Sequence, residues 1–410
     1  MTWQRTALSV AVSMLCTLPQ QQAVASSSYF INYQNKPMFE LQILNAGETL
    51  QDPPDIFMDE EFESLSTAKR NITEQEINGL LQAGSLWAEI LGPGTINTTP
   101  VKVQVVGLGE DYENASAISF PNLNAAGDFE KVLGPTGQFT MNEPAQFPAN
   151  VVIGKGLNFS YPSNWYTLPD GGGFDFVATV AHEFGHLLGI SFFEKCDFSF
   201  NSFLYDNRGV QYTPPQKILV RFDGSANDYG ENDFLVGLGS QSGVYFKGRH
   251  VSEVLAGSGL EGIAINGAEW DGSEWYYELS HFELERSMMS HQNYRNYTFF
   301  MEAELAAMQD LGYTIDRKNF YGRSIYANGQ TIVNTQGFYA RNSEGSAYLE
   351  GKVNTATLGT GLHVYGKNNN ITQAADLLAG GTGGVGMRVD GSNNVLTIAD
   401  GVQVRADGLN

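Results

Sequence analysis

One stretch of the chain shows a clear helical pattern of apolar residues. The residues at spacings of three and four are apolar, namely Val177, Val180, Ala181, Phe184, Leu187 and Leu188. This period predicts an amphipathic helix whose apolar stripe faces a core. Asp175 precedes the stripe as a candidate N-cap, and Gly189 follows it as a residue that can end a helix with positive φ.

Further elements are predicted on both sides of this helix. From Thr73, which can form a capping box with Glu76, a second apolar stripe runs to Ile90 and ends at Gly92. A third helical pattern covers residues 298–311. Alternating or short apolar runs predict strands at 39–43, 101–106 and 149–154. This mixture of helices and strands indicates an α+β fold.

The pattern changes from about residue 322 onward. Short β-like runs alternate with turns rich in glycine and asparagine, and the clearest runs are 331–333, 362–365 and 395–398. Short strands separated by turn residues at intervals of roughly ten to twenty residues are typical of a β-solenoid. The final turn would expose a strand edge near Asn410, so we expect the natural chain to continue there or a partner to cover the edge.

The beginning of the chain has the organisation of a secretory signal peptide. Arg5 supplies the positive charge, an apolar run extends from Ala7 to Leu18, and Ala23-Val24-Ala25 matches a cleavage signal. We therefore expect residues 1–25 to be removed on export. No later run of about eighteen apolar residues occurs, so no stable membrane insertion is expected.

Charge and cysteine content narrow the range of partners. The chain has 23 basic and 45 acidic residues, and loss of Arg5 with the signal peptide leaves 22 basic residues and a formal charge of −23. Such acidity argues against nucleic acid and anionic membranes as partners. Cys16 leaves with the signal peptide, so no intramolecular disulfide is expected, and Cys196 is interpreted as a small buried residue.

The predicted helix at 175–189 carries the strongest chemical signal. His182, Glu183 and His186 form the motif H-E-x-x-H-x-x-G together with Gly189. Residues at i and i+4 share one helix face, so the two imidazoles can bind one Zn²⁺. Glu183 then has the place of a general base for a water that the metal activates. The motif predicts the first half of a zinc peptidase site, and two ordinary helix histidines are the competing interpretation.

A catalytic zinc needs a third protein ligand as well as an open position. In the compact metzincin motif a third histidine follows three residues after the glycine, where this chain has Phe192. The ligand must therefore come from farther downstream. The candidates are His250, His281, His291 and His363, or a carboxylate such as Glu253 or Glu261.

Two downstream blocks resemble the leishmanolysin-type metzincins, a family of zinc peptidases. The first leads from Ser280-His281-Phe282 to Met288-Met289-Ser290, and the second ends in Asp310-Leu311-Gly312-Tyr313. In that family a long insertion separates the helix motif from a third zinc histidine, which is followed by a Met-turn and a helix ending in D-[IL]-G-[FY]. The resemblance covers about residues 73–322. This chain departs from the family in a shorter His-to-Met spacing and in lacking the usual cysteines.

The resemblance implies roles for individual residues. His281 would be the third zinc ligand, and Met289 would be the Met-turn residue beneath the metal, with Met288 as the alternative. His291 lies two residues after Met289, where some other metzincins carry a tyrosine near the metal. It is therefore a candidate transition-state donor, and an ordinary surface histidine is the competing interpretation.

The glycine-rich C-terminal segment is similar to the passenger regions of bacterial autotransporters. That similarity implies a bacterial protein displayed on the cell surface or released from it, with a membrane β-barrel farther downstream in a longer natural chain.

The sequence thus predicts an α+β chain in four parts. These are a signal peptide (1–25), an N-terminal extension (26–63), a metzincin-type zinc peptidase domain (64–322) and a β-solenoid-like passenger segment (323–410). The expected activity is Zn²⁺-dependent hydrolysis of peptide bonds in protein or peptide substrates outside the cell. One alternative is a catalytically inactive surface adhesin or binding module. Another is a gluzincin whose third ligand is Glu253 or Glu261.

Overall fold

The described structure is a mixed α+β fold, which confirms the α+β part of the predicted fold class. It is a computed structural model that describes residues 27–50, 65–92, 100–109, 115–118, 149–156, 158–161, 173–188, 190, 192–194, 204–206, 219–221, 244–246, 248–260, 262–264, 268–270, 275–277, 281–282, 284, 286–290, 300–310 and 313–408. The predicted signal peptide and the residues Gly189, Cys196, Glu261 and His291 lie outside the described residues.

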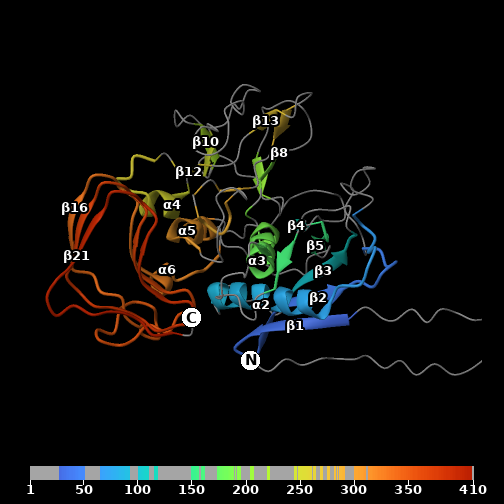
Figure 1. The fold of residues 1–410 in the computed structure, drawn as a ribbon, viewed down its shortest axis with the longest axis horizontal. Coiled ribbons are helices and arrows are strands. Elements are labelled where there is room, and N and C mark those ends of the chain that lie inside the picture. Colours follow the sequence, from blue (N-terminus) through green and yellow to red (C-terminus); the bar gives the residue numbers. More distant parts are fainter. Residues whose placement is uncertain are drawn as a thin grey trace, which may run out of the picture.

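A five-stranded sheet lies next to the motif helix (Figure 1). In spatial order its strands are β1 (Ser27–Tyr33), β2 (Lys36–Ile43), β3 (Val101–Gly107), β5 (Ala149–Ile153) and β4 (Ala115–Ile118). The three central strands are parallel, and the edge strands β1 and β4 run antiparallel to their neighbours. The predicted strands at 39–43, 101–106 and 149–154 are confirmed, whereas β1 and β4 were not predicted.

Two helices pack together on one face of this sheet. α2 (Glu74–Leu91) begins at Thr73 with the predicted capping box and ends at Gly92, whose φ is 57°. α3 (Phe176–Leu187) begins at Asp175, whose carboxylate accepts a hydrogen bond from the amide of Ala178. The indole N–H of Trp87 on α2 donates to the carbonyl oxygen of Ala181 on α3 at 2.7 Å. Both predicted helices are confirmed, and this hydrogen bond holds α3 against α2.

The N-terminal strands belong to the core that supports α3. Ile31 of β1 and Phe39 of β2 are each 1% exposed and lie in the same apolar cluster as residues of α2 and α3. The ring of Phe39 packs edge-on against the ring of Phe184 at 5.3 Å between centroids. The described residues of the predicted 26–63 extension therefore share one core with the described part of 64–322.

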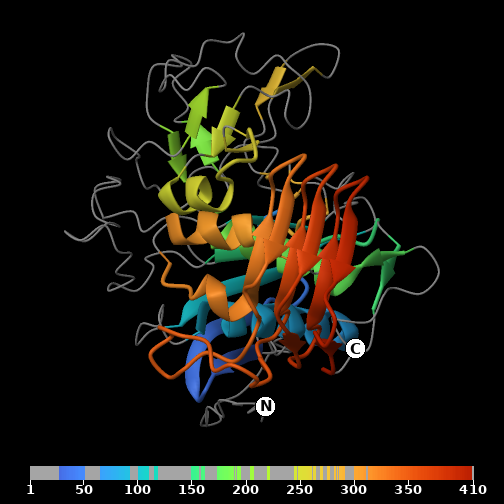
Figure 2. The same cartoon turned by 90° about the vertical axis from the view of Figure 1, so that its left-hand side faces the viewer.

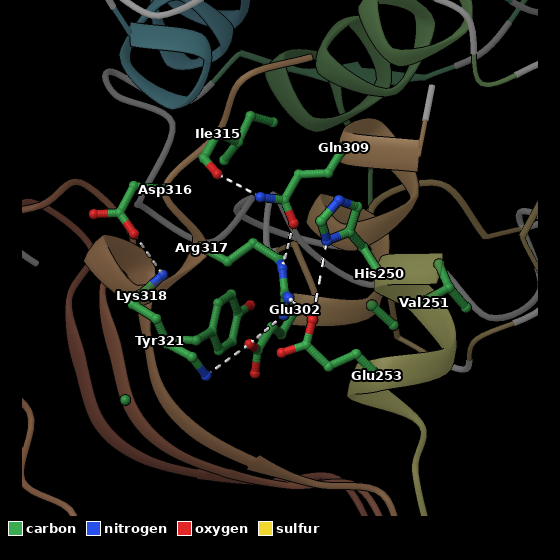
Figure 3. A network of polar contacts seen from close by, with 12 residues as sticks. His250, Val251, Glu253, Glu302, Gln309, Ile315, Asp316, Arg317, Lys318 and Tyr321 are labelled. Atoms are coloured by element: carbon green, nitrogen blue, oxygen red, sulfur yellow. Dashed lines mark hydrogen bonds and ion pairs between the residues drawn. The ribbon is translucent and has the colours of Figure 1, made fainter. Parts of the chain in front are cut away.

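Three short helices lie between the sheet and the C-terminal segment: α4 (Arg249–Val254), α5 (Glu302–Asp310) and α6 (Arg317–Phe320). The predicted helix at 298–311 is therefore shorter at its N-terminal end. Figure 3 shows the polar network that joins the three helices. The guanidinium group of Arg317 donates to Glu302 at 2.7 Å, to Glu253 at 3.2 Å and to Gln309.

The strands of the C-terminal segment pair in parallel (Figure 2). One sheet contains β15 (Tyr321–Ile325), β17 (Thr360–Val364) and β20 (Val385–Val389), and a second contains β16 (Thr331–Asn334), β18 (Asn370–Gln373) and β21 (Val395–Ile398). A third pairs β19 (Leu377–Ala379) with β22 (Val404–Ala406). The predicted strands at 331–333, 362–365 and 395–398 are confirmed.

The interior of this segment has an apolar cluster and several buried polar side chains, among them the amides of Asn334 and Gln373. Its cluster includes Phe338, Leu362 and Ile371, all of which are fully buried. The side-chain amide of Asn334 on β16 donates to the amide oxygen of Gln373 on the neighbouring strand β18 at 2.7 Å. The amide oxygen of Asn334 accepts from the amide of Gln336, and the side-chain amide of Gln373 donates to the carbonyl oxygens of Gln336 and Ala375, so neither buried amide carries the cost of an unpaired polar group.

Nine shorter strands complete the described elements. They are β6 (Phe159–Ser160), β7 (Phe174–Asp175), β8 (Phe192–Glu194), β9 (Leu204–Asp206), β10 (Leu219–Arg221), β11 (Val244–Phe246), β12 (Ile263–Ala264), β13 (Ala268–Trp270) and β14 (Trp275–Tyr277). Within the described residues, no helix has both the length and the apolar character needed to cross a membrane.

Candidate metal centre

Three imidazole rings converge where α3 meets the segment that follows β14. The Nε2 atom of His182 lies 2.9 Å from Nε2 of His186 and 3.1 Å from Nε2 of His281. The first two residues are one turn apart on α3, and the third is 99 positions after His182. In the part of the chain that the structure describes, these three residues form a group able to hold a metal ion. The sequence-predicted ligands are therefore brought together.

The outer nitrogens of two rings are held by backbone carbonyl groups. Nδ1 of His182 lies 2.7 Å from the carbonyl oxygen of Met288, and Nδ1 of His186 lies 2.7 Å from that of Ile190. A carbonyl oxygen only accepts hydrogen bonds, so each Nδ1 must carry the proton. In the neutral rings, Nε2 then has a bare lone pair.

These lone pairs make the site suited to a cation. Two unprotonated nitrogens of His182 and His186 that face each other at 2.9 Å repel unless a positive charge lies between them. Tetrahedral Zn²⁺ with Zn–N bonds of about 2.05 Å sets its nitrogen ligands about 3.3 Å apart. The observed separations are tighter by only a few tenths of an ångström. A histidine that binds a metal through one ring nitrogen usually donates the N–H of the other to a carboxylate, a carbonyl group or water. The Nδ1 contacts of His182 and His186 follow this pattern.

Glu183 occupies the expected place between the two helix ligands. It lies on α3 and is 6% exposed, while His182 and His186 are 2% and 6% exposed. Glu183 is therefore held on a rigid and largely buried helix beside the ligand group. The C-terminal end of that helix is also fixed, because the hydroxyl of Tyr313 donates to the carbonyl oxygen of Leu188 at 2.6 Å.

Met288 and Met289 support the site in two different ways. The carbonyl group of Met288 orients the ring of His182. The side chain of Met289 is fully buried and packs against α3 at Gly185. A Cβ atom at Gly185 would lie 2.1 Å from the sulfur of Met289 and 3.2 Å from the ring of Trp87. The thioether therefore packs against the turn of α3 that separates His182 from His186.

We expect Gly185→Ala to destabilise the metal-free protein by about 1–3 kcal/mol, because the added methyl group overpacks a filled site. In a Met289→Ala background the same change should cost less, because the sulfur atom is gone and only the ring of Trp87 remains close to the methyl group. Urea unfolding of the four proteins measures this difference. An equal effect of Gly185→Ala in both backgrounds would contradict the contact.

The sequence reasoning missed Glu304, which holds the turn of the two methionines. Its carboxylate accepts hydrogen bonds from the amides of Met289 and Met301, each at 2.7 Å, and from the amide of Met288 at 3.4 Å. Burial raises the pKa of Glu304 to about 7, although these hydrogen bonds oppose the rise. Nothing in a helical pattern identifies such a residue, because a buried acid and an exposed acid look alike in sequence.

Glu304 predicts a specific pH dependence of stability. Its folded-state pKa of about 7 lies above the ordinary value of 4.5, so the folded protein holds this proton more tightly than the unfolded chain. Stability from this group is full below pH 4.5 and is lost as the pH rises toward 7, by about 3 kcal/mol at about 1.4 kcal/mol per pKa unit. The unfolding free energy of metal-free wild type, minus that of Glu304→Gln, should fall by this amount between pH 4.5 and 7.5. Urea unfolding across that range measures it, and parallel curves would contradict the assignment.

The other sequence candidates that the structure describes do not join the ligand group. His250 and Glu253 lie on α4, and Glu253 is paired with Arg317 while its side chain is 65% exposed. His363 is buried in the C-terminal segment and contacts Asp390 at 2.9 Å. In the described residues, the metal-binding group thus contains three histidines and no carboxylate.

Comparison of the chain with known protein families, with curated proteins and with solved structures finds no match. The fold and the site are therefore the basis for assigning a function.

Proposed function

We propose that the chain is a zinc-dependent endopeptidase of the metzincin type. The observation that carries this proposal is the convergence of three Nε2 atoms, two of which belong to rings whose Nδ1 atoms are committed to backbone carbonyl groups. Three imidazole ligands without a carboxylate suit Zn²⁺, and a site with three protein ligands leaves a fourth position for water. The packing of Met289 against α3 agrees with the metzincin assignment.

In this proposal His182, His186 and His281 hold the ion, and Glu183 moves the proton. A bound Zn²⁺ supplies Lewis acidity toward water and the scissile carbonyl group. Glu183 accepts a proton from the attacking water and then delivers it to the leaving amine. The negative charge that develops on the oxygen of the scissile carbonyl group calls for a further hydrogen-bond donor. His291, which lies outside the described residues, stays a candidate for this role.

The edge of the central sheet offers a place for an extended peptide. β4 is one of the two edge strands of the five-stranded sheet, and it lies close to α3 (Figure 1). Its outer side has backbone N–H and C=O groups that no described strand pairs with. A peptide that added to this edge would gain backbone hydrogen bonds regardless of its side chains. Such binding suits an enzyme that acts on protein or peptide substrates.

We further propose that the C-terminal segment is a β-solenoid of an exported protein. Support comes from its parallel pairs, in which Thr331 lies beside Asn370 and Asn370 beside Val395 on successive turns of the chain. Export to the bacterial cell surface or the medium is supported by the signal-like residues 1–25 and by the high negative charge.

Metal removal and restoration test the proposed activity in the full chain. We expect about one zinc per chain by elemental analysis, cleavage of casein, loss of cleavage after dialysis against dipicolinate, and recovery with one equivalent of zinc. Zinc binding without any cleavage of casein or of a mixed peptide library would favour the inactive binding module instead. Absence of bound zinc after reconstitution would contradict the site itself.

A further inference from the structure

A second cluster of charged residues connects the C-terminal segment to the metal centre. Arg388, on β20, donates from its guanidinium group to the carbonyl oxygen of Arg286 at 2.9 Å. Asp390 follows β20 and pairs with Nε of Arg388 at 2.7 Å, while its other carboxylate oxygen lies 3.9 Å from the guanidinium group of Arg286. We call the described residues of 323–410 the β-segment. Arg388 and Asp390 of the β-segment thus both contact Arg286, which follows the third histidine, His281.

We call the described residues of 281–290 the ligand loop, and Arg286 lies at a turn within it. It has a φ of 68°, a left-handed conformation that non-glycine residues rarely adopt. The loop ends are joined, because the amide of Phe282 donates to the carbonyl oxygen of Met289 at 2.9 Å. The turn at Arg286 therefore sets where His281 and Met289 lie relative to each other.

The cluster is buried at His363 and Asp390 and reaches the surface at Arg286, whose side chain is 44% exposed. The side chains of Asp390 and Arg388 are 9% and 13% exposed, and that of His363 is fully buried. Nε2 of His363 lies 2.9 Å from the same carboxylate oxygen of Asp390 that pairs with Arg388. Although burial alone would raise the pKa of Asp390, its contacts with His363 and Arg388 keep that pKa below the ordinary value. Asp390 is therefore a fixed negative charge that orients Arg388.

We propose that Asp390 and Arg388 are positioning residues for the metal centre, and that the β-segment holds the ligand loop in its metal-binding geometry. The inference rests on the proposed metal site, although not on peptidase activity. Removal of a group that hydrogen-bonds directly to a metal ligand typically changes metal affinity about 10–100-fold. Here the contact acts on the backbone of the loop, and so on the position of the His281 ring.

The alternative is a purely structural role, in which the cluster fixes the β-segment to the rest of the chain. Two tyrosines already make such connections: the hydroxyl of Tyr326 accepts from the amide of Ala303 at 3.2 Å, and that of Tyr321 donates to the carbonyl oxygen of Phe300. A structural role predicts a change in unfolding temperature without a change in the metal site. The experiment must therefore measure a property of the metal site in addition to the unfolding temperature.

The test compares Asp390→Asn and Arg388→Lys with wild type in the full chain. Zinc affinity is measured by competition with a chromophoric chelator, and the visible spectrum of the Co²⁺-substituted protein reports ligand geometry. Hydrogen exchange of the 282 and 289 amides reports the loop in the metal-free protein. The matched control is Asp407→Asn, which alters an exposed Arg405–Asp407 pair in the same β-segment.

We expect Asp390→Asn and Arg388→Lys to weaken zinc binding about 10–100-fold, to alter the Co²⁺ spectrum and to speed exchange in the loop, while Asp407→Asn changes none of these. Should Asp390→Asn fail to fold, Arg286→Ala removes the same ion pair at a side chain that is 44% exposed. Unchanged affinity, spectrum and exchange in the folded variants would overturn the inference. Wild type that binds no zinc would instead contradict the proposed metal site, so the two failures are distinguishable.

Discussion

Glu183→Gln is expected to reduce peptide-bond hydrolysis by about 10²–10⁴-fold while leaving zinc bound, because glutamine keeps the size of the side chain and loses its basicity. The three metal ligands are unchanged in this variant. Since Glu183 is a residue of α3 that is 6% exposed, an isosteric replacement should also preserve the helix. The loss should therefore fall on kcat, with little change in zinc content or thermal stability.

The measurement is cleavage of a quenched fluorescent peptide beside elemental analysis of the same samples. Glu74→Gln is the matched control, since Glu74 is an exposed acid in the first turn of α2 and has no role in the proposed reaction. Full activity of Glu183→Gln with zinc bound would exclude Glu183 as the base. Loss of zinc along with activity would show instead that the residue supports the metal.

The parts of the fold that could be predicted from sequence are those that local physics determines. Thr73 and Glu76 satisfy each other across one helical turn, and Asp175 caps α3 from three residues away. Such pairs require only short-range contacts, so the sequence shows them directly. The hairpin of β1 and β2 was missed because Gln34 and Asn35 adopt positive φ without a glycine to signal the turn.

The residues of the site likewise divide into those that local spacing predicts and those that only long-range contacts reveal. The i and i+4 spacing of His182 and His186 could be predicted from the helix alone, whereas His281 came from a resemblance because no periodicity links residues 99 positions apart. Glu304 and Gly185 could not be found at all. Their roles depend on long-range packing against Met289, which a single sequence does not show.

The same long-range packing changes the interpretation of the predicted four-part organisation. The β-segment contacts the ligand loop through Arg388, and the strands of the N-terminal extension pack against α3 through Phe39. Residues from both ends of the described chain therefore contact the helix and the loop that carry the three histidines.

His281→Ala is expected to weaken zinc binding by more than the roughly 10–100-fold that is typical of changes around a metal site, because it removes one of three ligands. Two helix histidines alone hold Zn²⁺ in an incomplete set of protein ligands, with more positions left to water. Catalysis should fall with occupancy, and adding zinc should restore only part of it. Competition with a chromophoric chelator and elemental analysis after dialysis measure both effects.

His250→Ala is the matched control, since it removes the same side chain from α4, outside the ligand group. Its amide keeps the hydrogen bond to Asp310 at 2.9 Å, so the helix should stay in place. Retention of tight zinc by His281→Ala would exclude His281 as a ligand and would point to a carboxylate, as in the gluzincin alternative. Glu253 would be a poor replacement, because its carboxylate is engaged by Arg317. Weak zinc binding in His281→Ala alone would therefore identify a site of three histidines, two fixed by one helix and the third by a loop that depends on distant contacts.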